Sequence, residues 1–171
     1  LLERAINLLI NCGVQEISIN VHYLSDQIKI FMNKKKFNTK INISDETDLL
    51  LDTGGGVLAG TSNFNDNPFF VINPDTLWNK TYEEEVIKLE EIYLKNNKPS
   101  LLLVDKSLSL DTSFVGDFNL KERMIFKGEE NQFIFTGLHI TKRSFLKSKK
   151  LKVFSMNKIW DDLIEDKNLY G

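Results

Sequence analysis

The sequence predicts an α/β fold with a mixed, mainly parallel sheet and helices on both of its faces. Helical and strand periodicities alternate through the first hundred residues, as crossover helices between parallel strands require. The continuous apolar run at residues 101–104 is typical of a strand buried on both faces. After Asp105 the pattern changes to strands separated by short polar turns, which predicts antiparallel strands added to the parallel core.

Composition limits the possible functions. The chain has 171 residues, 42% of them hydrophobic, and shows no repeat or linker, so we expect one domain over residues 1–171. The formal net charge of -2 gives no electrostatic reason to bind nucleic acid. No apolar run is long enough to span a membrane, so no membrane partner is expected. Cys12 is the only cysteine, which excludes an internal disulfide framework and fits a cytoplasmic location.

The first part of the chain reads as helix, strand and helix. Residues 1–11 place apolar side chains at broad helical spacing, and Gly13 is suited to cap that helix in the left-handed conformation. Apolar and polar residues alternate over 16–21, which predicts a strand. Ser25 is expected to cap a second helix that runs to about Met32.

The middle of the chain continues the alternation. Residues 40–44 predict a short strand, and residues 45–56 a loop that leads into three glycines. Residues 68–73 form a buried-strand pattern, and residues 82–94 carry apolar side chains on one helical face. Pro99 then marks the turn into the strand at 101–104.

The last part of the chain predicts strands and two helical pieces. These elements are expected as strands at 114–120, 123–126 and 132–140 and as helices at 144–146 and 155–165.

One stretch carries a candidate ligand site. Residues 52–60 read DTGGGVLAG, and the three glycines would expose backbone N–H groups to a planar or anionic ligand. The strand at 68–73 then delivers the carboxylate of Asp75 to the carboxyl edge of the sheet, where open α/β sheets bind ligands. The glycines lack both the Gly-x-Gly-x-x-Gly spacing and the P-loop lysine. A flexible loop, or a turn that needs positive φ, would also explain them.

These pieces resemble the sugar-1-phosphate nucleotidyltransferases. LLLDTGGGVLAG followed by PFFVINPD is similar to the N-acetylmuramate-1-phosphate uridylyltransferase and mannose-1-phosphate guanylyltransferase-like branch. That branch shows an acidic-Thr-Gly-Gly-Gly turn and a strand that ends in Asn-Gly-Asp. Further similar pieces, in the same order, are residues 13–28, 101–105, 116–120 and 135–140.

The resemblance implies a single-domain, Rossmann-like, GT-A-like three-layer sandwich and an activity in nucleotide-sugar biosynthesis, such as that of the cell wall. An oxygen of a sugar 1-phosphate would attack the α-phosphorus of an NTP (UTP or GTP, with UTP favoured by the branch), and pyrophosphate would leave. The implied nucleotide contacts are Thr53, Gly54, Gly55 and Asn73. The implied catalytic residue is Asp75, as a ligand of Mg²⁺ that bridges the nucleotide phosphates.

The implied sugar contacts are Gly116, Asp117 and Gly137. A hairpin turn at Gly116-Asp117 and a bulge within a strand at Gly137 explain these residues equally well. Two positions depart from the branch, because Pro74 stands where glycine is usual and Asp52 where glutamate is usual. Both changes bear on whether the site is fully active.

The resemblance also places three parts of the enzyme outside this sequence: the N-terminal strand, the Gly-rich phosphate loop after it, and a second metal-binding aspartate. We therefore expect impaired activity in this chain, with an exposed gap in its sheet. A catalytically inactive nucleotide- or sugar-binding module is the main alternative. An NAD-linked oxidoreductase lacks its glycine motif here, and a structural α/β domain without ligand would not be stabilised by nucleotide. His22 is expected to be a packed loop residue, and His139 to face solvent or a neighbouring strand. Oligomeric state stays open.

Overall fold

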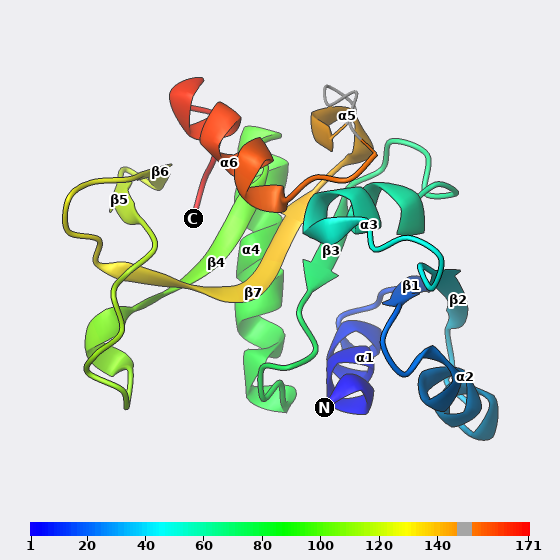
Figure 1. Cartoon of the computed structure of the whole chain (residues 1–171). Helices are drawn as coiled ribbons and strands as arrows, with labels where there is room; N and C mark the ends of the chain where they lie inside the picture. The colour runs from blue at the N-terminus through cyan, green and yellow to red at the C-terminus, as the bar shows by residue number, and fades with distance from the viewer. Residues whose placement is uncertain (147–151) are drawn as a thin grey trace.

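The structure is a computed structural model that describes residues 1–146 and 152–171. It consists of strands with helices on both sides (Figure 1). The helices are α1 (Leu2–Asn11), α2 (Ser25–Lys34), α3 (Asp52–Gly60), α4 (Glu83–Asn96), α5 (Arg143–Leu146) and α6 (Met156–Glu165), with 3₁₀ turns η1 (Lys80–Tyr82) and η2 (Lys106–Leu108). The strands are β1 (Glu16–Val21), β2 (Lys40–Asp45), β3 (Phe69–Ile72), β4 (Ser100–Asp105), β5 (Asn119–Lys121), β6 (Met124–Phe126) and β7 (Phe133–Thr141).

The predicted α/β class with a mixed sheet is confirmed, although the balance of strand directions differs from the expectation. β1 and β2 pair in parallel. In the three-stranded sheet β3-β7-β4, however, β7 pairs antiparallel with both neighbours. β3 and β4 run in the same direction, but the long strand β7 lies between them. Among the described residues, antiparallel pairings therefore outnumber parallel ones.

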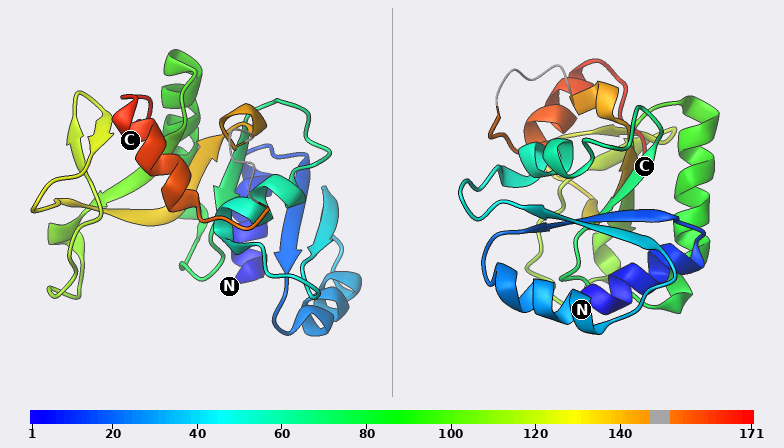
Figure 2. Two further views of the ribbon diagram at one scale, coloured as in Figure 1. Left: turned by 45° about the horizontal axis from the view of Figure 1, so that its top comes forward. Right: turned by 90° about the vertical axis from the view of Figure 1, so that its right-hand side faces the viewer.

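Three layers are visible when the molecule is viewed from the side (Figure 2). Helices α1, α2 and α4 cover one face of the strands, and α3 and α6 cover the other. The two faces differ along β1. Its apolar side chains Ile17, Ile19 and Val21 pack with α1 and α2, whereas Ser18 and Asn20 approach the glycines of α3. The alternation read from the sequence thus fixes which side of β1 faces each helix layer.

Three sequence expectations need correction. The loop expected at 45–56 ends at Leu51, because α3 begins at Asp52 and contains all three glycines. Ser25 is not a cap: Leu24 is the N-cap residue of α2, and Ser25 lies buried in the first turn. The strand expected from residue 114 begins only at Asn119, and before it only Phe118 pairs, in an isolated bridge with Phe133.

No helix in the described parts of the chain has both the length and the apolar character needed to cross a membrane.

Candidate functional site

A cleft of about 1140 Å³ opens between β1 and β3. One wall is formed by β1 and the first turns of α3, and the other by β3 with Asn73 and Pro74 behind it. Helix α1 forms the floor, and the start of α6 closes the far end. The cleft runs along the whole of β3 and reaches its carboxyl end, which is where open α/β sheets bind their ligands.

The glycines of α3 are packing residues rather than an open turn. The amides of Gly54 and Gly55 donate to the carbonyl oxygen of Phe154 at 2.9 and 3.0 Å. A Cβ on Gly54 would lie 2.9 Å from that oxygen and still closer to the Phe154 ring, and a Cβ on Gly55 would overlap the carbonyl of Lys152. The expectation of bare amides open to a ligand is therefore wrong for these two residues, because the segment before α6 occupies them.

A buried carboxylate on the other side of α3 was missed by the sequence reasoning. Glu46 is 7% exposed, accepts from Asn20 Nδ2 at 2.5 Å and accepts from the amide of Leu51 at 3.1 Å. Asn20 Nδ2 also donates to the carbonyl oxygen of Gly56 at 2.9 Å. Asn20 lies near the end of β1 and Glu46 directly after β2, and the carboxyl ends of parallel strands meet at one sheet edge. This shared edge of parallel strands is the signal from which the pair of Asn20 and Glu46 could have been predicted.

Thr53 joins α3 to α6. Its hydroxyl accepts from the amide of Met156 at 2.9 Å and lies 3.5 Å from the Ser155 hydroxyl, at the N-terminus of α6. The residue before it, Asp52, has a left-handed φ of 61° and accepts the Thr53 amide on its own carboxylate at 2.6 Å. Asp and Asn tolerate this conformation better than most residues. The first turns of two helices are thus tied together at the cleft.

Hydrogen bonds of the backbone and of two side chains, Thr76 and Trp78, hold the turn after β3. The amide of Asn73 donates to the carbonyl oxygen of Gly137 at 2.8 Å, and Trp78 Nε1 donates to the carbonyl oxygen of Asn73 at 2.7 Å. Trp78 itself is fully buried. Asp75 is exposed, and within the described residues its carboxylate has no hydrogen-bond or ion-pair partner.

The residues predicted to contact the sugar each make contacts within the protein. Gly137 has a φ of 90° beside a register shift in the β4–β7 pairing, and a Cβ there would lie 2.9 Å from the Cβ of Asn73. Asp117 accepts the amide of Phe135 on Oδ2 at 2.9 Å, and Gly116 packs against the backbone of Asn131. These contacts account for a bulge at Gly137 and a fixed turn at 116–117.

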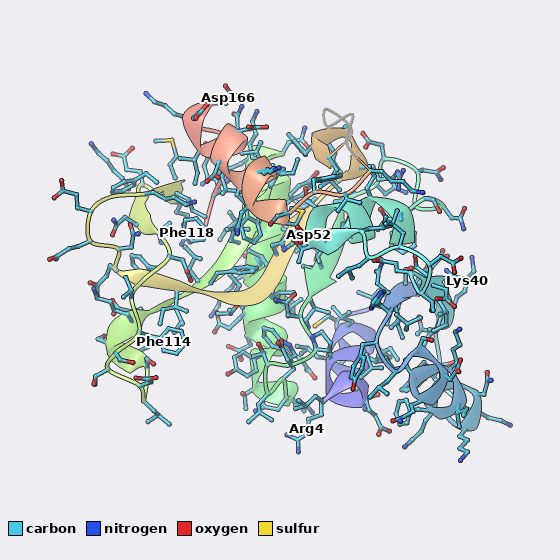
Figure 3. All side chains as sticks on the ribbon, viewed as in Figure 1. Arg4, Lys40, Asp52, Phe114, Phe118 and Asp166 are labelled. Atoms are coloured by element: carbon cyan, nitrogen blue, oxygen red, sulfur yellow. The ribbon has the colours of Figure 1, made fainter. Side chains whose placement is uncertain are left out.

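The cleft therefore brings some of the predicted residues together but not all. Thr53 and Asn73 line it, and Asp75 follows Asn73 by two residues. Gly54 and Gly55 lie beneath it, against the segment before α6. The segment that carries Gly116 and Asp117 lies apart from the start of α3, as the labels of Phe114 and Asp52 show in Figure 3.

One buried titratable group also lines the cleft. His139 on β7 is 3% exposed and packs against the rings of Trp160 and Phe135. Burial lowers the pKa of His139 to about 3, so the imidazole is neutral at physiological pH. The expectation that His139 faces solvent or a neighbouring strand is therefore too simple, because its ring is enclosed beneath α6.

No group of three or more His, Cys, Asp or Glu side chains with metal-binding geometry occurs within residues 1–146 and 152–171. Mg²⁺ does not require such a group, since it is commonly held by one or two carboxylates together with phosphate oxygens and water. Asp75, as an exposed and unpaired carboxylate, suits that kind of site.

No family model matches the chain. The N-acetylmuramate alpha-1-phosphate uridylyltransferase of Caulobacter vibrioides is 25% identical over 179 residues, which cover 100% of this chain and 74% of that protein.

Solved structures share the fold. HddC from Yersinia pseudotuberculosis matches with a TM-score of 0.67 and 22% identity, covering 91% of this chain and 67% of that one. The inositol-1-phosphate CTP transferase from T. maritima matches with a TM-score of 0.72 and 12% identity, covering 99% of this chain and 71% of that one. The chain is thus similar along its whole length to the uridylyltransferase, and it shares the fold of these solved structures.

Proposed function

We propose that this protein transfers a nucleotidyl group from an NTP to a sugar 1-phosphate in a magnesium-dependent reaction. A phosphate oxygen of the sugar 1-phosphate attacks the α-phosphorus, the bond from that phosphorus to the bridging oxygen breaks, and pyrophosphate leaves. Such chemistry needs positioning and charge neutralisation rather than a covalent nucleophile. The observation that carries the proposal is the cleft between β1 and β3, with Thr53 and Asn73 in its walls and Asp75 just beyond.

On the nucleotide side, Thr53 and Asn73 are the direct contacts we propose. The backbone N–H and C=O of Asn73 are both used within the protein, but its side-chain amide has no hydrogen-bond partner in the described residues. That amide carries both a donor and an acceptor for a base or ribose. Gly54 and Gly55 contribute in a different way, by letting α3 pack close to the segment before α6 so that Thr53 reaches the cleft.

Asp75 is the metal ligand we propose. Its carboxylate is exposed at the end of a strand and is not engaged by another residue of the described chain. Mg²⁺, when bound, would neutralise charge on the phosphates and orient them for attack. Asp75 itself would supply one carboxylate oxygen, with the remaining positions left to phosphate and water.

On the sugar side we propose Gly137, Gly116 and Asp117. Gly137 packs directly against the side chain of Asn73, where a Cβ would lie 2.9 Å from the Cβ of Asn73, so the two proposed contacts are neighbours. One carboxylate oxygen of Asp117 accepts a hydrogen bond from the backbone of β7, and the other is available to a sugar hydroxyl. UTP is the first nucleotide to test, since the Caulobacter relative is a uridylyltransferase, and GTP is the second, since one HddC structure is a complex with GMP-PN. A cytoplasmic location is part of this proposal.

The test is pyrophosphate release with Mg²⁺, each NTP and a panel of sugar 1-phosphates, for the wild type, Asp75→Asn and a matched Asp26→Asn control. Asp26 is an exposed carboxylate on α2 and does not line the cleft. Loss of release in Asp75→Asn alone supports the proposal. Equal release from Asp75→Asn and the wild type would remove Asp75 from the mechanism, and no release from any protein would reject transfer by this chain.

Pro74 favours a second candidate, a catalytically inactive nucleotide- or sugar-binding module. Pro74 lines the cleft and has no backbone N–H to offer a ligand. An inactive module predicts thermal stabilisation by UTP or GTP with Mg²⁺, because a ligand that binds only the folded state stabilises it by about 2.7 kcal/mol at 100 times its Kd. It also predicts that pyrophosphate release stays absent under the same conditions.

A further inference from the structure

Three buried nitrogen atoms beside the cleft have no hydrogen-bond partner among the described residues. They are Nδ1 and Nε2 of His139 and Nε1 of Trp160. The two rings lie edge to face, with centroids 5.5 Å apart and planes at 88°. His139 is 3% exposed and Trp160 7% exposed, so bulk water does not satisfy these atoms.

The neighbours of these rings in residues 1–146 and 152–171 are apolar. The ring of Phe135 lies 4.8 Å from that of Trp160 and 6.0 Å from that of His139, measured between centroids. On β7, His139 lies opposite Val71 of β3 and Leu101 of β4. Buried polar groups in folded proteins are nearly always hydrogen-bonded, and leaving them unpaired costs free energy. A polar partner that reaches this cluster would recover that cost.

The cleft is the route by which such a partner can enter. His139 and Trp160 both line it, as do Met156 and Asn157 at the start of α6. His139 follows Gly137 by two residues, and the carbonyl oxygen of Gly137 holds the amide of Asn73. His139 therefore lies on the same strand as Gly137, a proposed sugar contact, and opposite Val71, two residues before the proposed nucleotide contact Asn73.

We propose that His139 and Trp160 bind a neutral hydrogen-bonding substituent, a hydroxyl or an amide, of the sugar 1-phosphate. This inference rests on the proposed function and deepens it, because it names a specificity-determining pair. A neutral imidazole offers one donor and one acceptor, and the indole offers one further donor. The apolar surroundings disfavour a carboxylate, because a charge would be buried there without a cationic partner.

Binding measurements on single variants test the pair. His139→Phe keeps an aromatic ring against Trp160 and removes both nitrogens, whereas His139→Gln keeps a donor and an acceptor. His22→Phe is the control, since His22 is exposed and outside the cleft. The probes are glucose 1-phosphate, N-acetylglucosamine 1-phosphate, inorganic phosphate and UTP, each titrated with Mg²⁺ and followed by calorimetry.

We expect His139→Phe to bind its preferred sugar 1-phosphate about tenfold more weakly than the wild type, which is the size of one net hydrogen bond. His139→Gln should recover part of that affinity, and the Kd values for UTP and inorganic phosphate should stay unchanged. Equal sugar 1-phosphate affinity in His139→Phe and the wild type would overturn the inference, since His139 would then be a packing residue only.

Nuclear magnetic resonance of the imidazole nitrogens in the wild type gives a second readout that requires no variant. A change in their chemical shifts on addition of the sugar 1-phosphate supports the inference, and unchanged shifts at saturation overturn it. If the wild type binds neither UTP nor any sugar 1-phosphate, the proposed function fails and the inference with it. If the wild type binds both but His139 does not respond, the inference alone fails.

Discussion

Acid should destabilise this protein through His139. The ring is enclosed by Trp160 and Phe135, and burial lowers its pKa from 6.5 to about 3. Because the folded state keeps this imidazole neutral, its contribution to stability is complete above the unfolded-state pKa and is lost as the pH falls towards the folded-state pKa. At about pH 5 this imidazole is protonated in the unfolded chain and neutral in the folded chain. The difference lowers the free energy of unfolding by about 2 kcal/mol.

The assay is urea unfolding at about pH 8 and about pH 5, followed by tryptophan fluorescence, since Trp78 and Trp160 are both buried. The wild type should lose about 2 kcal/mol more of its unfolding free energy between these pH values than His139→Phe does. His22→Phe, which removes the exposed histidine, should behave as the wild type. Comparing losses between proteins cancels the titration of all groups that they share.

Another acid-sensitive contact does not disturb this comparison. The hydrogen bond from Lys29 to Asp45 holds the pKa of that carboxyl well below its usual range. A lowered carboxyl pKa gives stability that is lost only below the ordinary value of about 4, which lies outside the pH range of the assay. If His139→Phe and the wild type lose the same free energy between the two pH values, the imidazole is not held neutral by burial and this reasoning is refuted.

Three further substitutions test the packing around the site by urea unfolding. Gly54→Ala should cost about 1–3 kcal/mol, because its Cβ would overlap Phe154, whereas Ala59→Ser at an exposed position of α3 should be nearly neutral. Glu46→Ala should cost about 1–3 kcal/mol, since it leaves a buried backbone amide unpaired, and an unchanged midpoint would contradict the network at α3. Asp117→Ala should cost about 1.5–3 kcal/mol, because it removes the charged acceptor of a β7 amide.

Much of the fold could be read from local patterns. Period-two alternation gave β1, helical spacing gave α1 and α4, and the apolar run at 101–104 gave β4. These signals depend only on which face of an element is buried. The antiparallel direction of β7 was also expected, but its place between β3 and β4 could not be read in the same way, because strand order is set by the path of the whole chain.

The part that the glycines of α3 play could not be predicted from the sequence. The sequence indicated residues 52–56 as special, but it gave no sign that Gly54 and Gly55 would donate to Phe154, about a hundred residues later. A glycine that permits positive φ and a glycine that permits close packing look identical in one sequence. None of the glycines at 54–56 has positive φ, so packing is the operative reason.

The packing of α3 also decides which groups remain available to a ligand. The carbonyl oxygen of Phe154 accepts hydrogen bonds from two amides of the first turn, and the hydroxyl of Thr53 accepts one from the amide of Met156. That hydroxyl retains its own proton, and the side chain of Asn73 retains both a donor and an acceptor. We therefore propose that nucleotide recognition in the cleft depends on side chains more than on a bare backbone. Asn73→Ala should then weaken nucleotide binding more than a substitution at Gly55 does. At Gly55, any loss of binding would follow from the loss of packing.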